Sequence, residues 1–158
     1  MSYHFAGYDD LEIGQRFVSE GRTITETDLA LSCMLSGDWH SMHADKTYAE
    51  RNHMPERIMH GGFGVMIAIG IATRLPMFSG KIIGATGLNE WKFLKPLFKG
   101  DTVRVEATIT RKKITSDGVR AIVERRIVMR NQREEVVQEG YIGTMIDSGK
   151  HDESRILD

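Results

Sequence analysis

The clearest pattern along this chain is the alternation of apolar and polar residues in its second half. Residues 101–110 place four apolar side chains on one side of the chain, namely Val103, Val105, Ala107 and Ile109. This spacing predicts a half-buried β-strand. Related patterns predict further strands over residues 87–97, 119–129 and 136–146. Asp117-Gly118, a typical hairpin sequence, lies between two of these strands and predicts that they are antiparallel neighbours.

The first half of the chain predicts mainly helices. Thr25 and Asp28 have the spacing of a capping box, so we expect a helix that starts after Thr25 and ends at Ser36-Gly37. A shorter helix is expected over residues 46–52. Ahead of both, residues 16–24 are expected to form a first strand.

Residues 61–74 predict a different kind of helix, which Pro76 ends. The thirteen residues from Gly61 to Thr73 carry no charge, and apolar side chains surround the whole helix. A membrane-spanning helix needs roughly 20 such residues, so we expect a helix buried on nearly every side by protein. One apolar helix followed by consecutive antiparallel strands predicts an α+β fold in which a sheet wraps the helix.

Composition narrows the class of protein. The 158 residues suit a single domain, expected over 1–158 with its core at about 8–147. The net charge of −1 gives no reason to expect nucleic acid or a membrane surface as partner. Cys33 is the single cysteine, which argues against a disulfide scaffold. The first five residues lack the pattern of a signal peptide, so we expect a cytoplasmic protein.

Candidate chemistry lies in the segment between the predicted helices. Asp38 and His43 are five residues apart, and a carboxylate with an imidazole is a common pair for activating water. His60-Gly61 opens the apolar helix. A backbone N–H at a helix N-terminus can stabilise a developing anion, and glycine lets a ligand approach it closely. The two segments together predict an enzyme that adds or removes water.

Three ordered motifs in this chain resemble the single-domain MaoC-like dehydratase family, which includes (R)-specific enoyl-CoA hydratases. They are Ser36-Gly37-Asp38 with His43, Ile58-Met59-His60-Gly61, and the passage Phe93-Leu94-Lys95-Pro96-Leu97-Phe98-Lys99-Gly100-Asp101-Thr102-Val103. The resemblance covers roughly residues 8–147. It implies the hot-dog fold, in which a curved antiparallel sheet wraps one long helix, and reversible hydration of an enoyl thioester.

The resemblance also implies roles for single residues. Asp38 and His43 would activate the water as catalytic residues, and the Gly61 N–H would bind the thioester oxygen. His40 and His60 are further candidates for substrate binding. Where the family commonly has Asn-Pro, this chain has His40-Ser41. Three lysines of the third motif region could meet the phosphates of coenzyme A, although lysines more often form a solvated face: Lys92, Lys95 and Lys99.

The same resemblance implies a homodimer, a substrate on coenzyme A or an acyl carrier protein, and no cofactor beyond the coenzyme A of the substrate. Two other functions fit part of the pattern. A hot-dog thioesterase often has an acidic residue on the central helix, which residues 61–73 lack. A non-catalytic acyl-CoA binding module would not need Asp38 and His43. Metal binding by Asp38, His40, His43 and His53 matches no metalloenzyme spacing, so we expect no metal.

Overall fold

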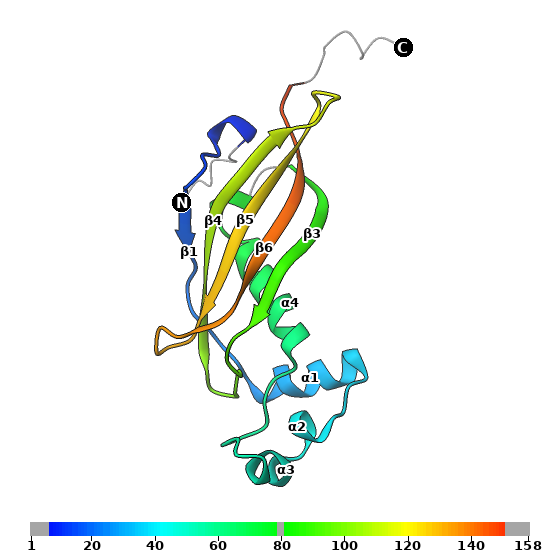
Figure 1. The fold of residues 1–158 in the computed structure, drawn as a ribbon, viewed down its shortest axis with the longest axis vertical. Helices are drawn as coiled ribbons and strands as arrows, with labels where there is room; N and C mark the ends of the chain where they lie inside the picture. Colours follow the sequence, from blue (N-terminus) through cyan, green and yellow to red (C-terminus); the bar gives the residue numbers. More distant parts are fainter. Residues whose placement is uncertain (1–6, 79–80, 151–158) are drawn as a thin grey trace.

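The structure of the protein is a computed structural model that describes residues 7–78 and 81–150 (Figure 1). Its helices are α1 (Glu26–Ser36), α2 (Ser41–Ala44), α3 (Lys46–Arg51) and α4 (Gly61–Ala72), with 3-10 turns at Tyr8–Asp10 and Pro76–Phe78. Its strands are β1 (Arg16–Val18), β2 (Arg22–Thr23), β3 (Ile82–Phe93), β4 (Thr102–Ile114), β5 (Arg120–Arg130) and β6 (Val136–Asp147). None of the helices within these residues is long and apolar enough to cross a membrane.

The strands form one antiparallel sheet in the order β1-β4-β5-β6-β3, and the two-residue strand β2 also pairs with β4. Helix α4 lies against one face of this sheet, while α1, α2 and α3 gather at the end where α4 begins (Figure 1). This is the expected α+β arrangement of a sheet around one apolar helix.

The alternation in β4 is confirmed. Val103, Val105, Ala107 and Ile109 are fully buried, and they face a core that includes Ile67, Ala68, Ile71 and Ala72 of α4. The polar residues between them point to the outer face. Burial of a large aliphatic side chain stabilises a fold by roughly 1.5–3 kcal/mol, so the contact between α4 and β4 is a main source of stability.

Several expected boundaries are wrong. Residues 16–24 form two short strands, because at Ser19 the side-chain hydroxyl accepts the N–H of Val105 at 2.9 Å and the ladder is interrupted before Gly21. Strand β3 spans 82–93 where 87–97 was expected. Its register shifts at three places, and such bulges hide a two-residue period. Strand β4 runs to Ile114, four residues beyond the expected end, and α4 ends at Ala72 instead of Arg74.

Helix α4 is less enclosed than expected. Its residues Ile67, Ala68, Ile71 and Ala72 are buried, whereas Gly62, Met66 and Gly70 lie on an exposed face. The Met66 side chain is 59% exposed. Burial on nearly every side is therefore wrong for the single chain, in which the sheet covers only one side of the helix.

Candidate active site

Asp38 is held by the chain reversal that follows α1. The capping box that starts this helix is confirmed, since the Thr25 side chain accepts the Asp28 N–H and Asp28 bonds back to Thr25. The helix ends at Gly37, whose φ of 73° is the left-handed conformation that glycine adopts most readily. Asp38 then accepts the backbone N–H of His40 through Oδ1 at 3.0 Å. The chain reversal thus presents a half-exposed carboxylate beside the next helix.

His43 lies on α2, a four-residue helix within the segment that joins the two predicted helices. His40 caps this helix, because its Nδ1 accepts the backbone N–H of Met42 at 3.2 Å. The Nδ1 of His43 lies 2.8 Å from the carbonyl oxygen of Ile58. A carbonyl only accepts, so we assign the ring proton of neutral His43 to Nδ1, which leaves the Nε2 lone pair free to act as a base.

The Nε2 atoms of two histidines approach the same oxygen of Asp38. Oδ2 lies 3.8 Å from Nε2 of His43 and 3.2 Å from Nε2 of His60, and the two imidazole rings are 5.5 Å apart. The backbone N–H of His40 holds the pKa of the Asp38 carboxyl below its usual value, and His43 and His60 lower that pKa further when they are charged. Asp38 is therefore an ionised acceptor at neutral pH.

The N-terminus of α4 adds hydrogen-bond donors to this group. His60 is its N-cap residue but makes no side-chain cap bond. Among the described residues, none accepts a hydrogen bond from the backbone N–H of Gly61 or Gly62. Such unpaired N–H groups, with the helix dipole behind them, favour an anionic oxygen.

A cavity of about 310 Å³ joins these parts. His43 and Gly61 lie in its wall, and most of its other lining residues are apolar, including Met54, Ile58, Phe93, Leu94 and Leu97. An apolar space beside a base and an anion-stabilising helix N-terminus suits an acyl group whose reactive end lies at His43 and Gly61.

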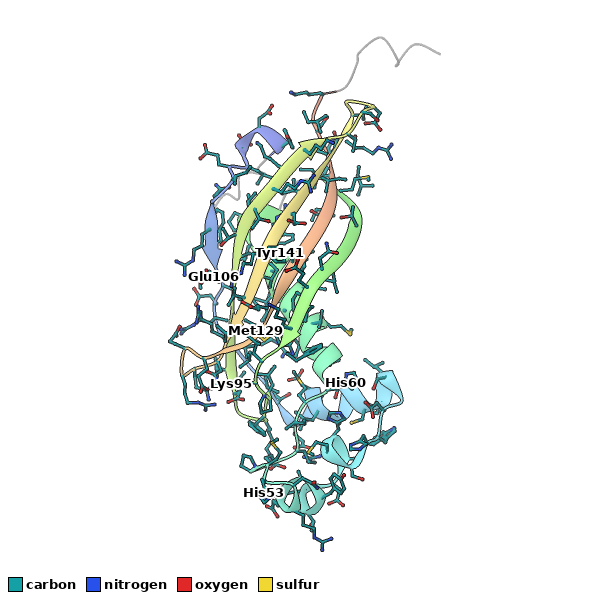
Figure 2. All side chains as sticks on the ribbon, in the orientation of Figure 1. His53, His60, Lys95, Glu106, Met129 and Tyr141 are labelled. Atoms are coloured by element: carbon teal, nitrogen blue, oxygen red, sulfur yellow. The ribbon has the colours of Figure 1, made fainter. Side chains whose placement is uncertain are left out.

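The other candidates are placed differently. His40 is exposed and outside the cavity wall, and its ring packs edge-on against Tyr48 with 5.8 Å between centroids. Substrate binding by His40 and His60 stays a prediction. Figure 2 shows His53 apart from His60, beyond α3. Within residues 7–78 and 81–150, no group of three or more histidine, cysteine or acidic side chains is arranged to hold a metal ion.

Two of the three candidate phosphate-binding lysines already have carboxylate partners. Lys95 lies in the cavity wall and contacts Glu135 at 2.5 Å, and Lys99 lies 3.5 Å from Glu26. Contacts with Asn131, Lys95 and Arg133 lower the pKa of Glu135 to about 2. Recognition of phosphate by these two lysines would therefore compete with existing ion pairs.

The sequence reasoning missed two residues of the cavity wall, Met54 and, on β6, Gln138. The Gln138 side chain is nearly fully buried and donates from Nε2 to the carbonyl oxygen of Gly61 at 3.2 Å. One glutamine within the residues of a strand does not indicate a functional site, so the sequence alone could not identify Gln138. Only the fold brings residue 138 to residue 61.

The cap role of His40 gives a testable expectation. His40→Ala removes the acceptor for the Met42 N–H and should lower the free energy of unfolding by about 1 kcal/mol. His40→Asn supplies a carboxamide oxygen that can accept the same N–H, so it should retain most of the stability. Urea denaturation of the three proteins checks this. Equal stability of wild type and His40→Ala would show that the cap contributes nothing.

Comparisons with known proteins agree with this geometry. Residues 10–131 match the family model described as "MaoC like domain". The chain is 34% identical over 105 residues to the (R)-specific enoyl-CoA hydratase of Rhodospirillum rubrum, which covers 65% of this chain and 69% of that protein. It is 30% identical over 107 residues to Protein MaoC of Klebsiella aerogenes, covering 68% of this chain but only 31% of that longer protein.

Solved structures show the same fold. R-Hydratase PhaJ1 from Pseudomonas aeruginosa is 32% identical with a TM-score of 0.72, over 89% of this chain and 84% of the other. A double hot-dog protein from Mycobacterium tuberculosis has a TM-score of 0.80 at 19% identity, over 90% of this chain and 44% of that chain. The hot-dog fold expected from the sequence is confirmed.

Proposed function

The chain belongs to the MaoC-like domain family, and from this premise we propose that it catalyses reversible hydration of a 2-enoyl thioester to the (R)-3-hydroxyacyl thioester. One observation carries the proposal: the carboxylate of Asp38 lies 3.8 Å from Nε2 of His43, and His43 lines the same cavity as Gly61. The other parts of the site support the same reaction.

The spacing between Asp38 and His43 suits a bound water. Oδ2 and Nε2 are 3.8 Å apart, too far for a direct hydrogen bond. A water about 2.8 Å from each atom would bridge them and donate one proton to each. His43 Nε2, with its lone pair directed at this position, would accept the proton as the water oxygen bonds to the β-carbon.

Addition at the β-carbon moves negative charge to the thioester oxygen. The Gly61 N–H would donate to that oxygen as the charge develops. The proton taken from water then returns to the α-carbon. The net change breaks one O–H bond of water and the π bond between the α- and β-carbons, and forms one C–O and one C–H bond. No redox step occurs, so the reaction would need no cofactor besides the coenzyme A or acyl carrier of the substrate.

The assay that tests this function follows two signals in one sample of purified protein with crotonyl-CoA. Hydration removes the ultraviolet absorbance of the conjugated thioester and releases no thiol. We expect that result, because α4 has no carboxylate that could activate water for attack on the carbonyl carbon. Release of coenzyme A thiol would indicate the thioesterase. Binding without either signal, tested also on longer and branched enoyl-CoAs, would indicate the binding module.

We also propose that the protein works as a homodimer. Strand β3 is an edge of the sheet, and four exposed apolar residues lie along it: Ile82, Ile83, Leu88 and Phe93. An unpaired apolar edge favours pairing with another strand. The same partner would cover the exposed face of α4 that carries Met66, since α4 and β3 adjoin where Ile69 lines a cavity with Ile82 and Leu88.

Sedimentation should therefore give twice the 17.9 kDa mass of the chain at micromolar concentration. Leu88→Lys should shift the protein toward monomer, because it places a charge in the buried contact. The matched control is Val18→Lys on β1, the opposite sheet edge, where the side chain is also exposed. This control should remain dimeric. A monomeric wild type, or an unchanged Leu88→Lys dimer, would contradict pairing through β3.

A further inference from the structure

The start of α4 is not fixed by its own sequence. His60 makes no side-chain cap bond, and the next two residues are glycines, which have the greatest backbone freedom. Yet the proposed reaction needs the first N–H groups of this helix at a defined position, because displacement by about 1 Å can cost about 100-fold in rate. A support from outside the helix is therefore needed.

Gln138 provides a contact at the required place. From β6 its Nε2 donates to the carbonyl oxygen of Gly61 at 3.2 Å, and its Oε1 accepts the indole N–H of Trp91 at 3.1 Å. The indole only donates and the carbonyl only accepts, so this pair of partners fixes which way the amide points. The side chain is 3% exposed, so water competes little for either bond.

The surroundings leave no room for another side chain. A Cβ added to Gly64 would lie 2.2 Å from Gln138 Nε2, and one added to Gly140 would lie 2.6 Å from the Trp91 ring. Real Cβ atoms do not approach other atoms this closely. The absence of a side chain at Gly64 therefore makes room for Gln138, and its absence at Gly140 makes room for Trp91.

We propose that Gln138, oriented by Trp91, is the positioning residue for the N–H groups that stabilise the enolate oxygen. A peptide unit is planar, so holding the Gly61 carbonyl also fixes the Gly62 N–H on the other side of the same unit. Gln138 thus sets the direction of the first helical peptide, and the Gly62 N–H becomes a second donor beside that of Gly61. This inference rests on the proposed hydratase function.

Kinetics of Gln138→Leu test the proposal. We expect kcat to fall about 10–100-fold with KM within about threefold, since the ground-state acyl contacts remain while transition-state stabilisation is lost. Gln132→Leu is the matched control. Gln132 also makes two hydrogen bonds, to Asp101 and the Thr102 N–H, but it does not reach α4. The Gln132→Leu substitution should change kcat by less than about twofold. Equal losses of kcat in both variants would overturn the proposal.

The free energy of unfolding, measured together with kcat, shows whether Gln138 positions the helix start or only fills space in the core. Gln138→Leu leaves the indole N–H of the partly buried Trp91 without its acceptor, which destabilises the protein. Trp91→Phe removes that donor, so the double variant should be less destabilised than the sum of the two single variants. Its kcat should stay as low as that of Gln138→Leu. Recovery of kcat together with stability would show that Gln138 acts only through packing, and would overturn the proposal.

Hydrogen exchange gives a readout that does not depend on activity. The Val65 N–H is expected to bond the Gly61 carbonyl within the first helical turn. We expect its exchange to accelerate about tenfold in Gln138→Leu and to be unchanged in Gln132→Leu. Unchanged exchange in Gln138→Leu would overturn the proposal. If the wild type hydrated no enoyl thioester, the proposed function would fail by itself, and this exchange rate would still decide whether Gln138 fixes the helix start.

Discussion

Asp38→Asn should lower kcat for hydration of an enoyl thioester by about 10²–10⁴-fold, the usual effect of losing an acid–base group. The carboxamide has the same shape and can still accept the His40 N–H, so the chain reversal after α1 should persist. It carries no negative charge to orient water or to share its proton. KM should change little, because Asp38 lies outside the wall of the acyl cavity.

Ionisation of Asp38 itself should add no pH dependence to this loss between about pH 6 and about pH 8. The His40 N–H holds the pKa of Asp38 below its usual value, so the wild-type carboxylate is ionised at both. Asp45→Asn is the matched control. Asp45 caps α3 by accepting the Tyr48 N–H at 3.2 Å, and asparagine caps helices equally well. A kcat in Asp38→Asn within threefold of wild type would remove Asp38 from the mechanism.

His43→Gln should cause a loss of similar size, about 10²–10⁴-fold in kcat. The glutamine amide can donate to the Ile58 carbonyl in place of the imidazole Nδ1, so α2 should keep its position. The substitution removes the basic Nε2, and an amide cannot accept the proton of the attacking water at neutral pH. Circular dichroism and steady-state kinetics on the same samples separate loss of the base from loss of fold.

His53→Gln is the control for this variant. His53 is exposed and stands apart from the site, so its activity should match that of the wild type. The double variant Asp38→Asn/His43→Gln should be scarcely less active than either single variant, because residues that act as a unit are strongly non-additive. Losses that simply multiply would indicate that Asp38 and His43 act on separate steps.

The sequence predicted features set by local chemistry. The capping box of Thr25 and Asp28, the glycine end of α1 and the alternation in β4 each depend on neighbouring residues, and all three are confirmed. The position of Asp38 beyond Gly37 follows from the same local signals. The spacing of Asp38 and His43 suggested their pairing, and the resemblance to a family added the hot-dog fold and the specific reaction.

Features set by distant contacts could not be read from the sequence. Helix α2 depends on an unusual histidine cap, and His43 is oriented by the carbonyl of Ile58, which is fifteen residues away. Arg125 has the strand position of an apolar residue. It is buried in the core because Thr144, the Met77 carbonyl and the Phe78 ring surround its guanidinium. Contacts of this kind produce no periodic pattern of residues in the sequence.

The path of oxygen from water decides whether this protein is an (R)-specific hydratase. The protein is incubated with crotonyl-CoA in ¹⁸O-labelled water, and the products are analysed by mass spectrometry and chiral separation. We expect an intact thioester with label in the 3-hydroxyl group and (R) configuration, and no such product with Asp38→Asn or His43→Gln. Label in the carboxylate of a free acid, an (S) product, or equal labelling by both variants would contradict the proposed function.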